Sequence, residues 1–239
     1  MNIFYNPDIE GDTVLLEEQE SKHAIRVLRL KKGDAVSLVD GKGGWYEAAV
    51  EEDHPKRCLL KVIKQIPEYR PLPYHLHLAI SPTKSVERFE WFLEKATEIG
   101  ISEITPLICH RTERNRINPE RLERILVSAM KQSLRAFKPR LHDPEPISDF
   151  LKTKREGING IAHCIPDQAG GLKDREAIWD LPQGSSYTIL VGPEGDFTEE
   201  EVSAALREGY TPFHLGEGRL RTETAGVYIC VAASFYSSR

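Results

Sequence analysis

Short apolar runs separated by polar turns dominate the first 70 residues of the chain. Runs of this length, bounded by Gly, Asp and charged residues, predict β-strands. The strands are expected at residues 13–16, 35–39, 45–51 and 57–66. Residues 18–30 instead show the 3.6-residue spacing of an amphipathic helix, with Ala24 and Val27 on its apolar side. Several short strands with one embedded helix indicate a compact β-rich barrel.

A proline-rich segment at residues 67–73 separates this part from a region with another pattern. Three prolines in seven residues favour an extended linker. From residue 74 onward, strand-like runs alternate with helix-like segments, which indicates an α/β fold with a parallel sheet. We therefore expect two domains, at 1–70 and 74–239.

The elements of the second domain follow from the period of its apolar positions. Strands are expected at 75–80, within 101–109, and at 160–165, 187–191 and 212–215. Helices are expected at 85–99, 120–137, 147–154, between Thr198 and Gly209, and from Thr222 onward. Thr198 and Glu201 have the spacing of a capping box. Leu134 and Leu206 are among the residues expected on buried helix faces.

The helix that begins at Thr222 is apolar on nearly every side. Its apolar residues are Ala225, Val227, Tyr228, Ile229, Val231, Ala232, Ala233 and Phe235. Such a helix must be buried over most of its surface.

Two glycine-rich turns follow the strands at 187–191 and 212–215. The first is Gly192-Pro193-Glu194-Gly195 and the second is Gly216-Glu217-Gly218-Arg219-Leu220-Arg221. Ligands bind at the carboxyl ends of parallel strands, and glycines let backbone groups approach a flat ligand closely. For a single Gly-x-x-Gly turn, an ordinary strand-to-helix connection is the favoured interpretation. Neither turn matches a phosphate-binding motif.

Composition narrows the function classes. Of 239 residues, 40% are hydrophobic and 29% charged, which is typical of a soluble globular protein. No apolar run approaches the ~20 residues that span a bilayer, so no membrane partner is expected. The four cysteines lack Cys-x-x-Cys pairing, which favours a reducing cytoplasm over a disulfide frame. His75 and His77 have no third ligand nearby in the sequence, so no metal is expected.

The net charge of −5 taken alone argues against nucleic-acid binding. The distribution of the charges along the chain is compatible with it. Residues 21–32 carry five Lys or Arg and no acid, and residues 110–140 carry nine against three acids. Local patches set the field that an RNA backbone feels. Lys22, Arg26 and Arg29 are spaced to share one exposed face. Solvated helix faces explain the same charges equally well.

The sequence GPEGDFTEEE, followed by LGEGRLRTETA, resembles the SPOUT class of RNA methyltransferases. Within that class it is most similar to the ribosomal small subunit RNA methyltransferase E family, which methylates N3 of a uridine in 16S ribosomal RNA. The resemblance implies a C-terminal α/β domain with a trefoil knot, an exception to the unknotted rule. It also implies a PUA-like barrel that contacts RNA, and a homodimer that pairs through the knotted domain.

The resemblance implies S-adenosylmethionine as the methyl donor, held by the two turns and the start of the last helix. The implied donor-binding residues are Leu190, Gly192, Pro193, Glu194, Gly195, Leu215, Gly216, Leu220, Thr222 and Thr224. The 163–166 stretch is a further candidate for the methionine end of the donor. The family usually has a second glycine after GPEG, where this chain has Asp196, an acceptable helix cap.

The resemblance also assigns residues to RNA binding. They are Lys22, Arg26, Arg29, Arg111, Arg114, Gln132, Ser133 and Arg135. The last three belong to a segment where the family often reads Glu-Gln-Ser/Cys-Gly-Arg. Here Lys131 and Leu134 replace the Glu and the Gly.

Methylation of uracil N3 requires loss of a proton from a poorly nucleophilic imide. Arg221 stands where it could stabilise the resulting uracil anion, in the manner of an oxyanion hole. Glu223 is a candidate to accept the proton or to hold Arg221 in place. A helix-starting carboxylate that stabilises the helix dipole is nearly as good an explanation for Glu223.

Two other functions remain open on these residues. One is a related SPOUT methyltransferase that acts on transfer RNA. The other is a non-catalytic RNA-binding protein that uses the barrel and the basic patches.

Overall fold

The computed structural model describes residues 2–114, 116–165, 175–181 and 186–237. Internal contacts divide the chain into two units, Met1–Pro71 with Val127–Lys138 and Leu72–Leu126 with Pro139–Arg239. The break after Pro71 falls within the proline-rich segment. The grouping of 127–138 with the first unit depends on contacts between residues far apart in the chain, which no local pattern reveals.

The first unit is built on a five-stranded sheet with the order β1-β3-β4-β5-β2. Its strands are β1 (Ile3–Tyr5), β2 (Thr13–Leu15), β3 (Ala35–Val39), β4 (Trp45–Glu52) and β5 (Leu59–Ile66). Neighbouring strands are antiparallel except β1 and β3. The sequence predicted the last four strands but not β1, which is three residues long. Phe4 of β1 is nevertheless buried in the core.

The helix expected at 18–30 is shorter and irregular. An α-helical turn, α1 (Glu18–Lys22), runs directly into a π-helix, η1 (His23–Val27). The wider π-turn changes which side chains face the core. Ala24 is buried, whereas Val27 is 65% exposed, so the expectation that Val27 packs inward is wrong. The three basic residues of this segment are exposed, as predicted.

The second unit contains, among its described residues, an eight-stranded sheet with the order β11-β13-β10-β12-β6-β7-β8 and with β9 beside β7. The strands are β6 (His75–Ile80), β7 (Glu103–Ile108), β8 (Arg140–Leu141), β9 (Glu145–Pro146), β10 (Ile158–Ala162), β11 (Glu176–Ala177), β12 (Ser186–Val191) and β13 (Thr211–His214). The pairings are parallel, as the strand–helix alternation predicts. The strands that the sequence missed have only two residues each.

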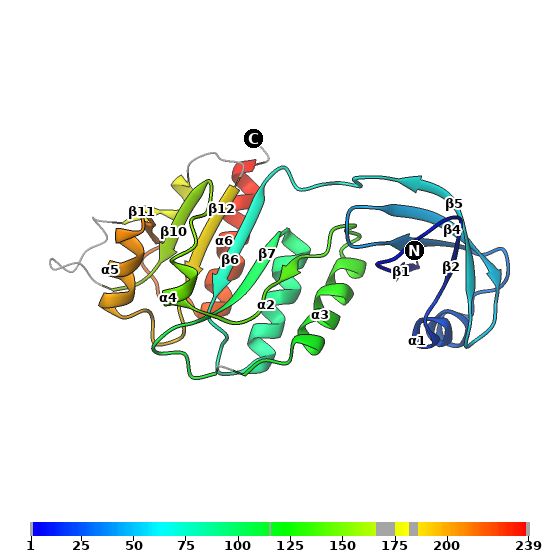
Figure 1. Cartoon of the computed structure of the whole chain (residues 1–239), viewed down its shortest axis with the longest axis horizontal. Helices are drawn as coiled ribbons and strands as arrows, with labels where there is room; N and C mark the ends of the chain where they lie inside the picture. The colour runs from blue at the N-terminus through cyan, green and yellow to red at the C-terminus, as the bar shows by residue number, and fades with distance from the viewer. Residues whose placement is uncertain (1, 115, 166–174, 182–185, 238–239) are drawn as a thin grey trace. The chain divides into compact units, whose positions relative to one another are not determined.

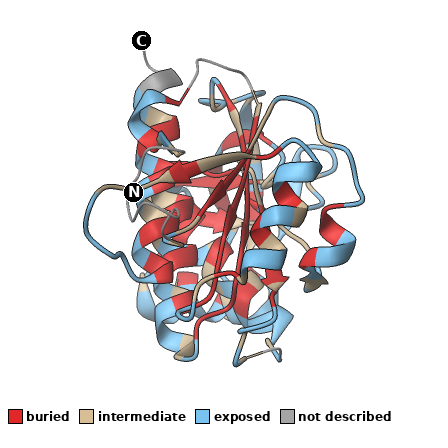
Figure 2. Ribbon diagram, turned by 90° about the vertical axis from the view of Figure 1, so that its left-hand side faces the viewer, coloured by how far each residue is buried: buried red, intermediate tan, exposed pale blue. Residues whose placement is uncertain are grey.

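Helices cover both faces of this sheet (Figure 1). They are α2 (Val86–Ile99), α3 (Pro119–Gln132), α4 (Ile147–Phe150), η2 (Ile178–Asp180), α5 (Glu199–Arg207) and α6 (Thr222–Ser237). Leu78 and Ile189 pack with residues of α2 and α6, whereas Ala79 and Leu190 pack with residues of α4 and α5. The central strands are therefore buried on both sides, as the red ribbon in Figure 2 shows.

The start of α5 matches its sequence signals. The capping box of Thr198 and Glu201 is formed, and Gly209 follows the helix with a φ of 84°. Leu206 is 44% exposed, so its expected burial is wrong. α4 is also shorter than the expected 147–154, because the helix ends at Phe150.

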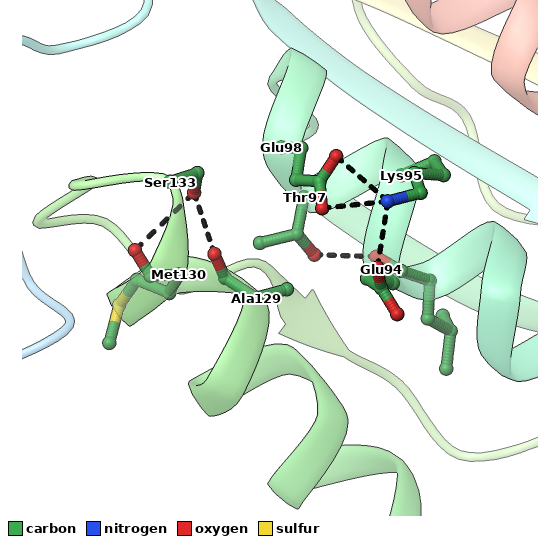
Figure 3. A network of polar contacts seen from close by, with 8 residues as sticks. Glu94, Lys95, Thr97, Glu98, Ala129, Met130 and Ser133 are labelled. Carbon is green, nitrogen blue, oxygen red and sulfur yellow. Dashed lines mark hydrogen bonds and ion pairs between the residues drawn. The ribbon is translucent and has the colours of Figure 1, made fainter.

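α3 ends at Gln132, five residues before its expected end at 137. Leu134 adopts a left-handed conformation with a φ of 57°, and Arg135 donates its backbone N–H to the Met130 carbonyl at 3.0 Å. This is a Schellman-type helix end. The hydroxyl of Ser133 donates to the carbonyls of the preceding turn (Figure 3). Leu134 is 37% exposed and terminates the helix, so it is not an inward-facing helical residue.

α6 is buried on one side only within a single chain. Ala225, Ile229, Cys230 and Ala233 are buried toward the sheet. Tyr228, Val231 and Phe235 are 40%, 50% and 54% exposed, and their spacing places them on one helix face. The expectation of burial on most sides is therefore not met by the chain alone. In the described residues, no helix combines the length and apolar character that crossing a membrane requires.

Candidate active site

A cavity of about 680 Å³ lies at the carboxyl ends of β10, β12 and β13. It is lined by both glycine turns and by the start of α6. Predicted donor-binding residues that line it are Gly192, Pro193, Glu194, Gly195, Leu215, Gly216, Leu220 and Thr222. The other two lie elsewhere. Leu190 is a fully buried core residue of β12, and Thr224 faces a second cavity.

Gly192, which directly follows β12, has little room for a side chain. A Cβ there would lie 3.0 Å from the ring of Phe197, a fully buried residue. The Gly192 carbonyl accepts a 3.0 Å hydrogen bond from the hydroxyl of Thr222, the first residue of α6. This buried bond fastens the first glycine turn to the end of the second. The carboxylate of Glu194 also accepts a 2.9 Å bond from the backbone N–H of Lys84.

Asp196 has a left-handed backbone with a φ of 63°. Glycine adopts this conformation without cost, and Asp tolerates it better than most residues. The Asp196 carboxylate accepts 2.8 Å hydrogen bonds from the backbone N–H groups of Cys164 and Phe197. Asp196 therefore ties the chain after β10 to the first turn. It is not the helix cap that the sequence suggested, because Thr198 fills that role.

Arg111 braces the first glycine turn from a neighbouring loop. Its Nη1 donates to the carbonyls of Gly195 at 2.6 Å and Phe197 at 3.2 Å. Arg114, from the same loop, donates from Nε to the Lys84 carbonyl at 3.1 Å. Arg111 is exposed and Arg114 is half-buried, and part of each guanidinium holds protein backbone rather than pointing freely at a ligand. Asn115 of this loop lies outside the described residues.

The second turn depends on Gly216, which has a φ of 112°. This value lies in the left-handed region that favours glycine. The backbone N–H of Gly216 donates to Nδ1 of His214 at 3.3 Å. The His214 ring meets the ring of Trp179 edge-to-face, with centroids 5.2 Å apart. Sequence patterns did not single out His214 or Trp179, because their proximity arises only when the strands pair.

The stretch suggested for the methionine end of the donor lines the same cavity through His163, Cys164 and Ile165. Its last residue, at 166, lies outside the described residues. Burial, reinforced by the Arg175 guanidinium, lowers the pKa of His163, while Asp196 acts in the opposite direction. Arg175 donates to the His163 carbonyl at 2.7 Å. His163 therefore contributes a neutral imidazole to the wall at pH 7.

A second cavity of about 610 Å³ shares Arg219, Leu220 and Arg221 with the first. Glu223 lines it and is 6% exposed. One carboxylate oxygen of Glu223 lies 3.8 Å from Nε of Arg88. The other oxygen is buried without a hydrogen-bond partner among the described residues. The two predicted catalytic residues, Arg221 and Glu223, thus line the same cavity, which adjoins the cavity formed by the glycine turns.

The sequence did not identify the three residues that α2 contributes to this second cavity, Glu87, Arg88 and Trp91. Trp91 is 43% exposed although α2 buries the neighbouring Phe92 completely. A tryptophan on the polar face of an amphipathic helix is the signal that could have found this site.

The residues predicted to bind RNA are divided between the two units. Lys22, Arg26, Arg29, Gln132, Ser133 and Arg135 belong to the first unit, whereas Arg111 and Arg114 belong to the second. In the first unit, Lys131 forms an ion pair with Glu20 at 3.1 Å. The lysine that replaces the family's glutamate is therefore matched by a carboxylate on α1.

Comparison with known proteins gives consistent matches along the chain. Residues 70–234 match the family model of an RNA methyltransferase domain, and residues 16–63 match that of an RNA methyltransferase PUA domain. A Synechocystis protein named ribosomal RNA small subunit methyltransferase E is 32% identical over 89% of this chain and 70% of its own length.

Solved structures agree with these matches. A probable rRNA-methyltransferase from Porphyromonas gingivalis is 42% identical, with a TM-score of 0.88 over 96% of this chain and 95% of its own. A ribosomal RNA small subunit methyltransferase E from Neisseria gonorrhoeae, bound to S-adenosyl methionine, is 26% identical. Its TM-score is 0.84 over 97% of this chain and 96% of its own.

The fold, the glycine-turn cavity and these matches define an RNA methyltransferase with an N-terminal PUA domain. More particularly, the chain belongs to the ribosomal RNA small subunit methyltransferase E family.

Proposed function

We propose that this protein transfers a methyl group from S-adenosylmethionine to N3 of a uridine in small-subunit ribosomal RNA. The observation that carries the proposal is the pair of adjoining cavities that share Arg219, Leu220 and Arg221. One cavity has the glycine turns expected of a donor site, and the other has a buried carboxylate. Two reactants held side by side are the main requirement of a group transfer.

The donor occupies the cavity formed by the glycine turns. Its volume of about 680 Å³ suits a small-molecule ligand. Gly192 and Gly216 keep the backbone accessible, and the Thr222–Gly192 bond holds the two turns in a fixed relation. A relative of known structure binds S-adenosyl methionine, which supports this placement.

The second cavity takes the target base. Glu223 accepts the N3 proton on its unpartnered oxygen, which leaves a uracil anion. N3 of this anion attacks the donor methyl carbon, the carbon–sulfur bond breaks, and its electron pair stays on sulfur to leave a neutral thioether. Arg221 stabilises the negative charge on the uracil oxygens. Arg88 holds the other oxygen of Glu223 and so positions the carboxylate.

RNA is held in part by the first unit. The exposed Lys22, Arg26 and Arg29 contact phosphates of the substrate, which fixes its register without reading its sequence. The match to an RNA methyltransferase PUA domain over 16–63 supports this role.

We also propose that the domain boundary lies in the 67–73 segment and that the C-terminal domain carries the trefoil knot.

Transfer of a labelled methyl group to ribosomal RNA, followed by mass mapping, tests the proposal. The expected product is N3-methyluridine in small-subunit RNA. Glu223→Gln should lower the turnover rate at saturating substrates by about 10²–10⁴-fold, because the amide cannot accept the proton. Donor affinity should be unchanged. Methylation of transfer RNA alone would replace the proposed substrate, and absence of donor binding would leave only a non-catalytic RNA-binding role.

We further propose a homodimer that buries the exposed face of α6. Tyr228, Val231 and Phe235 form an apolar face that a lone chain leaves in water. Sedimentation at micromolar concentration should show a dimer, and Val231→Glu should shift it to monomer. Leu206→Glu is the matched control, because Leu206 is 44% exposed on α5. A wild-type monomer at that concentration would exclude the dimer.

Because the proposed substrate is ribosomal RNA, we also propose that the protein acts in the cytoplasm.

A further inference from the structure

Three histidines surround Glu103 at the amino ends of β6 and β7. His75 Nε2 lies 3.0 Å from one carboxylate oxygen of Glu103. His142, which follows β8, contacts the other oxygen through its own Nε2. His77 stands beside them, with its ring centroid 5.2 Å from that of His142. The sequence alone places no third ligand near His75 and His77, but strand pairing supplies two more.

The side chains of His77, Glu103 and His142 can converge on one point. One ligand atom from each lies within 4.8 Å of the other two. Two histidines and a glutamate form a ligand set that zinc uses when it keeps a fourth position open. Zinc bonds of about 2.0–2.2 Å place tetrahedral ligand atoms roughly 3.3–3.6 Å apart. The cluster therefore has to close by about 1 Å, within the reach of side-chain rotation.

We propose that His77, Glu103 and His142 bind a divalent transition metal ion of the zinc class. His75 stands next to this set and fills the fourth position or holds the water that does so. The imidazole and carboxylate ligands suit zinc, and the absence of a thiolate distinguishes the set from common structural zinc sites.

Contacts around the three ligands suit a metal site. Nε2 of His77 lies 2.8 Å from the hydroxyl of Thr105, which is 1% exposed. A fixed outer contact of this kind orients a ligating imidazole. His77 is 7% exposed, whereas the side chains of Glu103 and His142 are 25% and 27% exposed. The site thus has a buried anchor and a side open to an incoming ion.

The position of the cluster assigns it a structural role. The strands are parallel, so the amino ends of β6 and β7 lie at the opposite edge from the glycine turns that follow β12 and β13. The ion would join β6, β7 and the chain after β8, a strand of two residues. Its function is to hold this short edge strand, separate from methyl transfer.

Titration of the chelator-treated full chain with zinc, followed by calorimetry, tests the proposal. One equivalent should bind per chain, and Co²⁺ should give the visible bands of a tetrahedral site. Zinc at a hundredfold excess over Kd should raise Tm by roughly 5–10 °C. Mutations of residues that only hydrogen-bond to metal ligands typically weaken metal binding by roughly 10–100-fold. Glu103→Gln and His142→Asn remove ligands themselves, so each should weaken zinc binding by more than that.

His23→Ala is the matched control, because His23 is an exposed histidine in the first unit. It should leave zinc affinity unchanged. Donor affinity should be the same in all variants, which shows that they fold and separates this result from the proposed methyl transfer. Absence of stoichiometric binding in the wild type, or equal zinc affinity in Glu103→Gln and the wild type, would overturn the proposal.

Discussion

Arg29 occupies a left-handed backbone conformation, with a φ of 57°, immediately after Leu28, the C-cap of the π-helix η1. The backbone N–H of the next residue, Leu30, donates back to the Ala24 carbonyl at 3.0 Å. This closing bond spans one residue more than a standard Schellman bond, in keeping with the wider π-turn. Glycine is the usual residue at such a position. A long basic side chain kept there at a conformational cost supports a role in binding.

Arg29→Gly should therefore raise stability while weakening RNA binding. Removing the Cβ relieves a left-handed cost of about 1–2 kcal/mol, partly offset by the entropy of glycine in the unfolded chain. The net gain should be about 0.5–1 kcal/mol, which corresponds to a rise in Tm of roughly 1–4 °C. Thermal denaturation measures it. Arg26→Gly is the control, because Arg26 lies within η1 and its replacement should lower Tm. A lower Tm for both variants would show that Arg29 carries no conformational cost.

Asp196 and Leu134 show how far single residues can be understood from sequence. Both stand where the family pattern has glycine, and both have positive φ values. The left-handed backbone conformation explains why the family has glycine at these positions. A sequence pattern shows which residue replaces that glycine, but it does not show the φ angle that favours glycine there. Asp196 could therefore be considered tolerable in advance, whereas its bonds to Cys164 and Phe197 could not be foreseen.

At the scale of elements, the glycines of the second turn are not equivalent. Gly216 has a φ of 112°, which a side chain would strain. Gly218, two residues later, has open space where a Cβ would lie and no positive φ. Only the first of these glycines is required by the backbone.

Gly216→Val should weaken donor binding by at least tenfold, which corresponds to about 1.4 kcal/mol. The turn must either adopt a strained conformation or move away from the donor. Gly218→Val should change donor affinity little, because its side chain enters open space. Calorimetry with S-adenosylmethionine measures both. Equal affinities for the two variants would remove Gly216 from the donor site.

Donor binding should also weaken in acid. The pKa of His163 lies below its ordinary value because of burial and of Arg175. His163 is therefore neutral at pH 7 and becomes charged only as the pH falls through this lowered pKa, below 6.5. A protonated imidazole would then repel the cationic donor. Donor affinity measured from pH 7.5 to 5 should fall at the acid end, and His163→Gln should remove that fall. If donor affinity still fell at low pH in the His163→Gln variant, His163 would not be the group that weakens donor binding in acid.

Elements whose apolar positions recur with a clear helical or strand period were predicted from the sequence. Elements without such a period were not. β6 agrees residue for residue with its expected range, because its apolar residues Leu76, Leu78, Ala79 and Ile80 mark a short buried strand between polar segments. The early end of α3 and the π-turn of η1 escaped prediction, because both depend on local backbone geometry. The Thr222–Gly192 bond and the ion pair of Arg88 with Glu223 join residues far apart in sequence, so only folding brings them together.

At the scale of the whole molecule, the residues of the proposed transfer site and two of the residues proposed to contact RNA belong to different units. The residues of the two cavities belong to the second unit, whereas Arg26 and Arg29 belong to the first. A phosphate contact strengthens binding and adds to its salt dependence. A charge that acts on the transition state changes the rate instead. The two sets of arginines should therefore be separable by measurement.

The double variant Arg26→Ala/Arg29→Ala should weaken RNA binding and make the slope of log affinity against log salt shallower by roughly one unit for each lost contact. Its donor affinity should not change. Arg221→Ala should instead lower the single-turnover rate at saturating RNA and donor, with RNA affinity little altered. Arg221 borders both cavities, and the proposed mechanism has charge develop there on the base as the methyl group moves. RNA affinity across a salt series and single-turnover methylation would distinguish the two. If Arg221→Ala lost RNA affinity and kept its saturated rate, Arg221 would belong with the phosphate contacts and another group would have to stabilise the anion.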